Sequence, residues 1–204
     1  MQDLTRFKES PSQTAGPYVH IGCTPNFCDI TGVYPRDLGS RMITGAVTGQ
    51  RITLRGRVFD GTGTPLRDAL IEIWQADAEG LYPSAAETRG KADPHFTGWG
   101  RSAGDMETGE FVFETVKPGP VPFRDGRLMA PHVTFWIVAR GINLGLHTRM
   151  YFADEDQANA ADPILARIEH KARIPTLLAR PEGDDTYRFD IHLQGADETI
   201  FFDV

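Results

Sequence analysis

The side chains that most often carry out enzyme chemistry form no obvious cluster in this sequence. His20, His95 and His170 stand in unrelated contexts, and no two of them have the spacing of a paired metal site. His147 and His192 fall within predicted strands, where a hydrogen-bonded or exposed imidazole is the usual case. The sequence also lacks a phosphate-binding loop and a G-x-G-x-x-G dinucleotide motif. These residues on their own indicate no self-contained catalytic site.

The amino-acid composition limits the class of protein to which this chain can belong. The 204 residues are 40% hydrophobic and 24% charged, which is typical of one globular domain. A formal net charge of −7 argues against binding to nucleic acid, because phosphate neutralisation needs clustered Lys and Arg. No apolar run is long enough to cross a membrane, and the charged N-terminus is no secretory signal. We therefore expect a cytoplasmic protein in which Cys23 and Cys28 are free thiols.

Short alternating segments separated by Gly and Pro predict an all-β fold. The 21 Gly and 14 Pro punctuate the chain, and apolar residues alternate with polar ones along 51–59. Further strands are expected at 69–75, 110–116, 133–139, 147–152, 186–193 and 199–202. This pattern predicts an antiparallel β-sandwich over residues 50–204, with one or two short helices. One helix is expected to start near Ala161, with Asp162 as its cap and Pro163 in its first turn.

Residues 1–49 differ from the rest of the chain. They are rich in Pro, Gly, Thr and Ser and show no clean hydrophobic period. An irregular stretch of this length is unusual inside a compact domain. We interpret it as an extended N-terminal arm that docks on a neighbouring subunit, and a docked arm predicts an oligomer.

Four stretches together resemble the intradiol ring-cleaving dioxygenases. They read GRVFDGTGTPLRDALIEIWQADAEGLY (56–82), TGWGRSAGDMETGEFVFETVKPGPVPF (97–123), APHVTF (130–135) and LHTRMYF (146–152). PSQTAGPYVHIG near the N-terminus and YRFDIHLQGADETIFFDV at the C-terminus extend the likeness over nearly the whole chain. Within the family the resemblance is to the iron-free α subunit of the enzymes built from two kinds of subunit.

The family's catalytic subunits hold ferric iron with two tyrosinates and two histidines, and the resemblance assigns those four positions here. The first tyrosine falls on Tyr82, but the second, after KPGP, is Val121. The first histidine falls on His132, and the second is replaced by Thr134. A valine cannot ligate iron, and a neutral hydroxyl is a poor substitute for imidazole. We expect no metal on this chain, with Tyr82 a half-buried phenol and His132 a hydrogen-bonded strand histidine.

The resemblance places iron on a partner β subunit and gives this chain a supporting part in the active site. It implies that Thr14, Ala15, Gly16, Pro17 and Tyr18 line the partner's pocket. Gly16 would let the backbone approach a planar ring, and Pro17 would fix its path.

One arginine is the preferred partner for the carboxylate of protocatechuate, the substrate that the resemblance implies. Arg140 follows the apolar run VTFWIVA, where a strand end meets a loop, and guanidinium suits a carboxylate. Arg149 and Arg124 are alternatives. The complex would cleave protocatechuate with O2 to give 3-carboxy-cis,cis-muconate, using Fe(III) of the β subunit in a large hetero-oligomer.

The sequence leaves three other functions open. A self-sufficient hydrolase or oxygenase of another type would need a catalytic cluster. A non-catalytic β-sandwich that recognises another protein would not need the order and spacing of an iron site. A homomeric intradiol dioxygenase acting on related catechols would need residues other than Val121 and Thr134 at those two positions.

Overall fold

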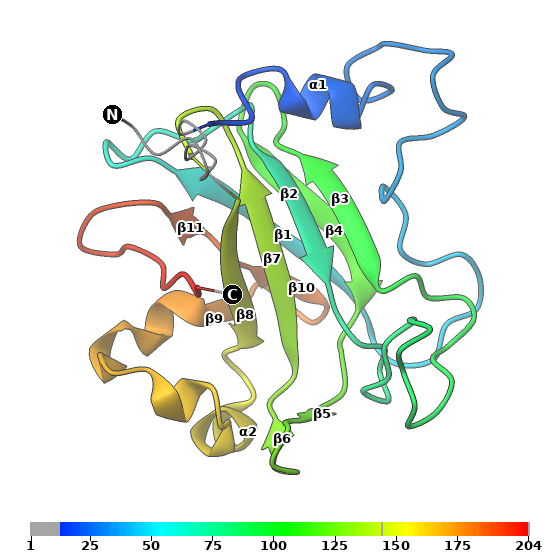
Figure 1. Cartoon of the computed structure of the whole chain (residues 1–204), viewed down its shortest axis with the longest axis vertical. Coiled ribbons are helices and arrows are strands. Elements are labelled where there is room, and N and C mark those ends of the chain that lie inside the picture. Colours follow the sequence, from blue (N-terminus) through cyan, green and yellow to red (C-terminus); the bar gives the residue numbers. More distant parts are fainter. Residues whose placement is uncertain (1–12, 144, 204) are drawn as a thin grey trace, which may run out of the picture.

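The computed structural model describes residues 13–143 and 145–203, and these form a nine-stranded mixed β-sheet with short helices at its ends (Figure 1). The sheet strands are β1 (Arg51–Phe59), β2 (Leu70–Trp74), β3 (Trp99–Ala103), β4 (Glu110–Val116), β7 (His132–Val138), β8 (Leu146–Phe152), β9 (Leu178–Pro181), β10 (Thr186–Arg188) and β11 (Ile191–His192). A separate pair is formed by β5 (Val121–Pro122) and β6 (Leu128–Met129). The helices are α1 (Val19–Cys23), α2 (Asp156–Ala161) and the 3-10 segments η1 (Leu165–Arg167) and η2 (Lys171–Leu177).

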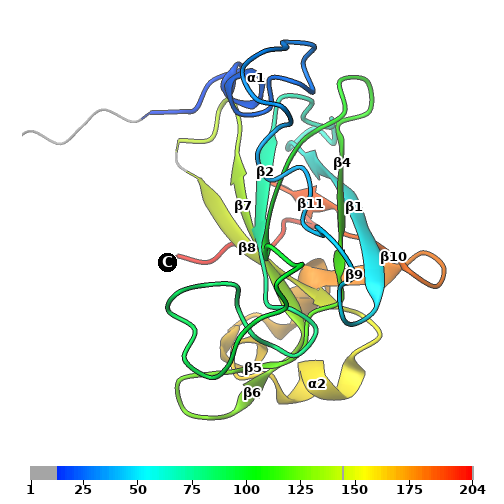
Figure 2. The same cartoon turned by 90° about the vertical axis from the view of Figure 1, so that its right-hand side faces the viewer.

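The strands follow the order β11-β1-β10-β9-β8-β7-β2-β3, and β4 pairs with β1. Figure 2 shows that β2, β7 and β8 lie in one layer and β1, β4 and β10 in the other. Alternation along β1 turns Ile52, Leu54 and Val58 inward, where they are buried. Phe111, Phe135 and other aromatic side chains fill the space between the layers. Burial of this apolar core is the main force that holds the two layers together.

The predicted all-β class with short helices is confirmed, whereas the purely antiparallel pairing is wrong. β10 and β11 both run parallel to β1, and β9 runs parallel to β8. Parallel neighbours need a long crossover, and the helical stretch between β8 and β9 provides one. Gly56 allows the close approach of the C-terminal segment, because a Cβ there would lie 1.8 Å from the Phe189 carbonyl oxygen. The result is a nearly closed, barrel-like mixed sheet.

Element boundaries agree with the sequence in two strands where buried residues recur at every second position. The strands predicted at 51–59 and 110–116 are β1 and β4. Residues 199–202 form no strand; Phe202 makes only an isolated bridge to His147. The helix predicted from Ala161 is also misplaced, because α2 ends at that residue. Asp162 nevertheless caps the next turn, since its Oδ1 accepts hydrogen bonds from the backbone N–H groups of Ile164 and Leu165.

The described part of the N-terminal segment, residues 13–49, lies against the chain's own sheet. Met42 is 2% exposed and belongs to the main core. The backbone N–H of Thr44 donates to the carbonyl of His95, and that of Arg101 donates to the carbonyl of Gly39. The segment is not wholly irregular, because it contains α1. Residues 1–12 of the predicted arm lie outside the described part, and docking of the arm on another subunit stays a prediction.

Within the described residues, no helix is both long enough and apolar enough to cross a bilayer.

Candidate functional site

The four positions that correspond to iron ligands gather at the start of β7. His132 opens the strand, and Thr134 follows two residues later, directly opposite Trp74 of β2. The Trp74 and Tyr82 rings stack with centroids 5.8 Å apart. Val121 of β5 is buried in a small apolar cluster against which Tyr82 packs. We refer to Tyr82, Val121, His132 and Thr134 together as the vestigial centre.

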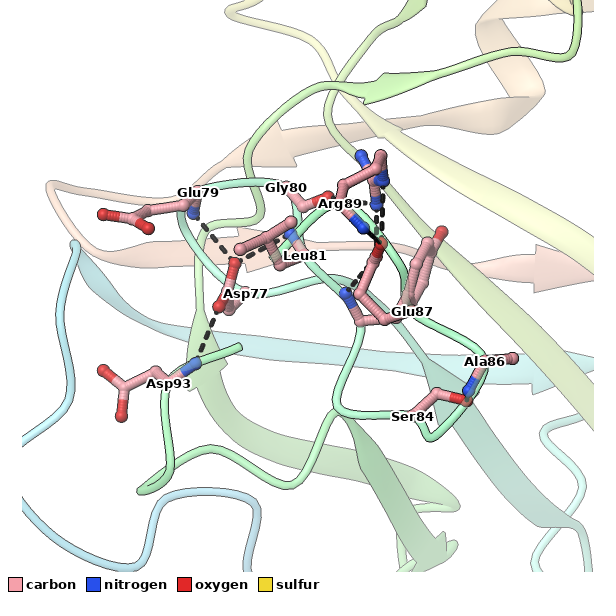
Figure 3. Close-up of polar contacts among 10 residues, drawn as sticks. Asp77, Glu79, Gly80, Leu81, Ser84, Ala86, Glu87, Arg89 and Asp93 are labelled. Carbon is pink, nitrogen blue, oxygen red and sulfur yellow. Dashed lines mark hydrogen bonds and ion pairs between the residues drawn. The ribbon is translucent and has the colours of Figure 1, made fainter. Parts of the chain in front are cut away.

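Tyr82 belongs to a loop after β2 whose hydrogen bonds involve Asp77 and Glu87 (Figure 3). The Asp77 carboxylate accepts hydrogen bonds from the backbone N–H groups of Glu79 and Leu81 through one oxygen and from that of Asp93 through the other. The Glu87 carboxylate accepts from the Tyr82 backbone N–H at 3.1 Å and forms an ion pair with Arg89. These bonds fix the loop backbone and thereby orient the Tyr82 ring.

His132 is held as a neutral imidazole. Its Nδ1 lies 2.7 Å from the carbonyl oxygen of Ala130, so this nitrogen carries the proton and donates. Burial, reinforced by the positive charge of Arg149, lowers the pKa of His132 to about 4. The expectation of a hydrogen-bonded strand histidine agrees with this geometry.

Arg149 brings a permanent positive charge to the vestigial centre. It lies on β8 directly opposite Thr134, and its Nη1 is 3.5 Å from the Met129 sulfur. Burial raises the pKa of the Tyr82 hydroxyl, and the charge of Arg149 partly opposes that rise. The guanidinium therefore acts on both potential ligands that remain, Tyr82 and His132.

The residues present do not fit a ferric ion. Val121 offers no donor atom, and Thr134 offers a neutral hydroxyl in place of an imidazole. Burial favours the protonated phenol of Tyr82, whereas iron needs the phenolate. Arg149 adds a positive charge that would repel a cation.

The buried His132 predicts a pH-dependent stability. Its folded pKa is about 4 and its unfolded pKa is about 6.5, so the unfolded chain binds more protons between these values. Stability then rises with pH through this window and is lost as pH falls through it, by up to about 3 kcal/mol. Urea unfolding should show His132→Asn, which keeps a donor for Ala130 but cannot titrate, losing less stability than wild type between pH 7 and pH 4.5. His147→Asn, on the neighbouring strand, is the control. Equal slopes for all three proteins would contradict the assignment.

The residues predicted to line a partner's pocket lie together at the opposite end of β7 from the vestigial centre. The Thr14 hydroxyl donates to the carbonyl oxygen of Ala139 at 3.0 Å, next to Arg140. Arg140 is itself exposed and pairs with Asp68 at 3.2 Å. The segment 14–18, which leads into α1 (Figure 1), thus shares one edge of the domain with Arg140.

The segment 14–18 presents an exposed surface at this edge. Tyr18 is 74% exposed, and Thr14 and Ala15 are also exposed. Gly16 has φ +77° with open space where a side chain would be, so its backbone conformation and not crowding favours glycine. A large exposed aromatic side chain on an ordered turn is suited to contact with another molecule.

Two features of this region and its surroundings escaped sequence reasoning. His20 on α1 is 3% exposed, and neither of its ring nitrogens has a hydrogen-bond partner in the described residues. Residues 100–104 read G-x-S-x-G, but this segment is no nucleophile elbow. Ser102 lies within β3, paired with Ile71, and its hydroxyl donates to the Ala103 carbonyl. An elbow needs a sharp turn from strand to helix, which β3 does not make.

The chain is similar to known dioxygenases in sequence. Residues 24–195 match the protein-family model described as "Dioxygenase". The chain is 46% identical to the protocatechuate 3,4-dioxygenase alpha chain of Pseudomonas putida, covering 96% of each chain. It is 36% identical to the protocatechuate 3,4-dioxygenase beta chain of Burkholderia cepacia, over 76% of this chain and 69% of that one.

The fold is also that of a solved family member. The structure of 3-chlorocatechol 1,2-dioxygenase from Rhodococcus opacus 1CP superposes with a TM-score of 0.58 at 24% identity, covering 76% of this chain and 64% of that one. The recognition made from the sequence motifs is confirmed, and this chain belongs to the intradiol dioxygenase family.

Proposed function

We propose that this chain is the iron-free α subunit of a protocatechuate 3,4-dioxygenase. The observation that carries the proposal is the 46% identity to an alpha chain over 96% of both chains. The likeness to a beta chain is lower and shorter, at 36% over 76% of this chain. The vestigial centre supports the same assignment, because two of four ligand positions hold Val121 and Thr134.

The complex would contain this chain and an iron-bearing β subunit in a large hetero-oligomer in the cytoplasm. Fe(III) on the β subunit supplies the activation of the catechol toward O2. The ring opens between its two hydroxyl-bearing carbons, and both atoms of O2 enter the product, 3-carboxy-cis,cis-muconate. The role of this chain is to shape the pocket, exclude water and support assembly.

The contribution of this chain to that pocket is the edge that carries Thr14, Ala15, Gly16, Pro17, Tyr18 and Arg140. The exposed Tyr18 ring would pack against the β subunit, and Gly16 would bring backbone close to the substrate ring. Arg140 would be the cation for the substrate carboxylate, because its guanidinium is exposed and suits a carboxylate. It forms an ion pair with Asp68 at 3.2 Å. Because water screens the exposed Arg140 guanidinium, it can exchange this partner for another carboxylate at little cost.

Ring cleavage by the separate and combined chains tests the proposal. This chain, its β-type counterpart from the same source and the co-expressed pair should be assayed for O2 uptake with protocatechuate. We expect no turnover by this chain alone and full turnover by the pair, with one O2 consumed per substrate. Turnover by this chain alone, or a pair that is no more active than the β-type chain, would contradict the proposal.

A further inference from the structure

A hollow of the surface includes two residues of the vestigial centre, Tyr82 and Val121, and lies at the opposite end of β7 from the edge that carries Tyr18. Its volume is about 480 Å³, which is within the usual range for small-ligand sites. Trp74, Tyr82 and Phe123 supply aromatic walls, and Val121 and Pro122 supply aliphatic surface. The remaining lining residues are Ser84, Ala86, Glu87, Thr88, Arg89 and Arg124. A flat apolar ring would match the chemistry of these walls.

The charges around the hollow favour an anion, although the chain as a whole is acidic. The Arg124 and Arg167 guanidiniums both lie over the Phe123 ring, 5.2 and 4.8 Å from its centroid. Neither forms an ion pair with a described residue, and Asp125 pairs instead with Arg127 at 2.8 Å. Of the two, Arg124 lines the hollow, and its exposed guanidinium would gain from an anionic partner.

The acidic residue in the lining does not cancel this preference. Glu87 has only 6% of its side chain exposed, and both of its oxygens are engaged by Arg89. Arg89 also donates to the Gly80 carbonyl at 2.8 Å, which keeps the pair in place. The negative charge of Glu87 is therefore compensated within the loop that Figure 3 shows. Arg124 remains as the exposed charge at the mouth of the hollow.

We propose that this hollow binds an aromatic carboxylate without a metal ion. The ring of the ligand would lie against Trp74, Tyr82 and Phe123, and its carboxylate would meet the Arg124 guanidinium. The site would be additional to the iron-containing site of the complex, one per copy of this chain. Because the residues of the vestigial centre do not fit a ferric ion, binding here leads to no ring cleavage.

Calorimetric titration of the complex with 4-hydroxybenzoate tests this proposal. This probe has a ring and a carboxylate but lacks the second hydroxyl, so the iron site cannot cleave it. The change in the visible iron band measures how many ligands bind at iron sites. The heat of binding measures how many ligands bind in total. We expect a second class of sites, one for each copy of this chain. Ligand binding to this silent class releases or absorbs heat but does not change the visible iron band.

Two variants and one neutral probe separate this site from others. Arg124→Gln should weaken the silent class about tenfold, the loss of roughly one charge-assisted contact, and leave the visible titration unchanged. Arg127→Gln, three residues along the same turn and paired with Asp125, should change neither class. The neutral 4-hydroxybenzamide should fill the silent class poorly. A calorimetric titration that saturates at one ligand per iron would overturn the proposal. So would a silent class whose affinity is unchanged in Arg124→Gln.

Failure of this binding proposal can be distinguished from failure of the proposed function. A complex without an iron band or without activity would contradict the assignment as a dioxygenase subunit. The same titration of the chain would then still reveal or exclude an Arg124-dependent site.

Discussion

Removing residues 1–18 should raise the KM of the complex for protocatechuate about tenfold or prevent its assembly. The deletion takes away the exposed turn that carries Gly16 and Tyr18, together with the tie from Thr14 to Ala139. A tenfold change corresponds to about 1.4 kcal/mol, a modest loss for one aromatic contact and the water exclusion around it. Steady-state kinetics and analytical size-exclusion chromatography of the co-expressed complex measure both outcomes.

Smaller changes at the same edge show which part of it matters. Thr14→Val removes only the hydrogen bond to Ala139 and should have a lesser effect than the deletion. Arg140→Ala should slow protocatechuate turnover more than catechol turnover, because catechol has no carboxylate. Asp68→Asn breaks the same ion pair but leaves the guanidinium, so it should leave both substrates nearly unaffected. A deletion with unchanged assembly and kinetics would refute the role of the arm.

Restoring the two lost ligand types should not restore iron binding while Arg149 is present. Val121→Tyr with Thr134→His rebuilds a set of two tyrosines and two histidines at the vestigial centre. A cation beside a guanidinium is repelled by about 4 kcal/mol per unit charge at 4 Å near a protein surface, and ferric iron carries three charges. Arg149→Gln removes that charge with a similar side-chain length. We expect stoichiometric iron and a tyrosinate-to-iron absorption band only in the triple variant.

Controls for this experiment are available within the same centre. Adding Tyr82→Phe to the triple variant should remove one ligand and weaken the band. Arg149→Gln alone should bind no iron, because Val121 and Thr134 are still in place. Stoichiometric iron in the variant that keeps Arg149 would show that its charge is not what excludes the metal.

The sequence predicted those elements whose signal is local. Along most of β1 and β4 a buried residue recurs at every second position, and the bounds of both strands were predicted correctly. β3 was missed because its WGRSA sequence has no such alternation: Gly100 stands where a Cβ would approach the Met42 sulfur at 2.7 Å. The parallel pairing of β10 and β11 with β1 joins segments far apart in the chain, and no local pattern specifies such a partner.

In the candidate site, too, the sequence predicted some features and missed others. The family motifs identified Tyr82, Val121, His132 and Thr134 as one set of positions, and the structure places them at one end of β7. The part played by Arg149 depends on the register between β7 and β8, which puts it opposite Thr134. Sequence reasoning could name this arginine only as an alternative partner for a carboxylate. Its charge at the vestigial centre follows from strand pairing.

Iron content of this chain, purified alone after expression in iron-rich medium, is the most direct test of its role. Metal analysis and visible spectroscopy should be carried out on the lone chain and on the complex with its β-type counterpart. We predict negligible iron and no tyrosinate-to-iron band in the lone chain, and one iron per pair of chains in the complex. Stoichiometric iron with the visible band in the lone chain would contradict the account and would make this chain a catalytic subunit.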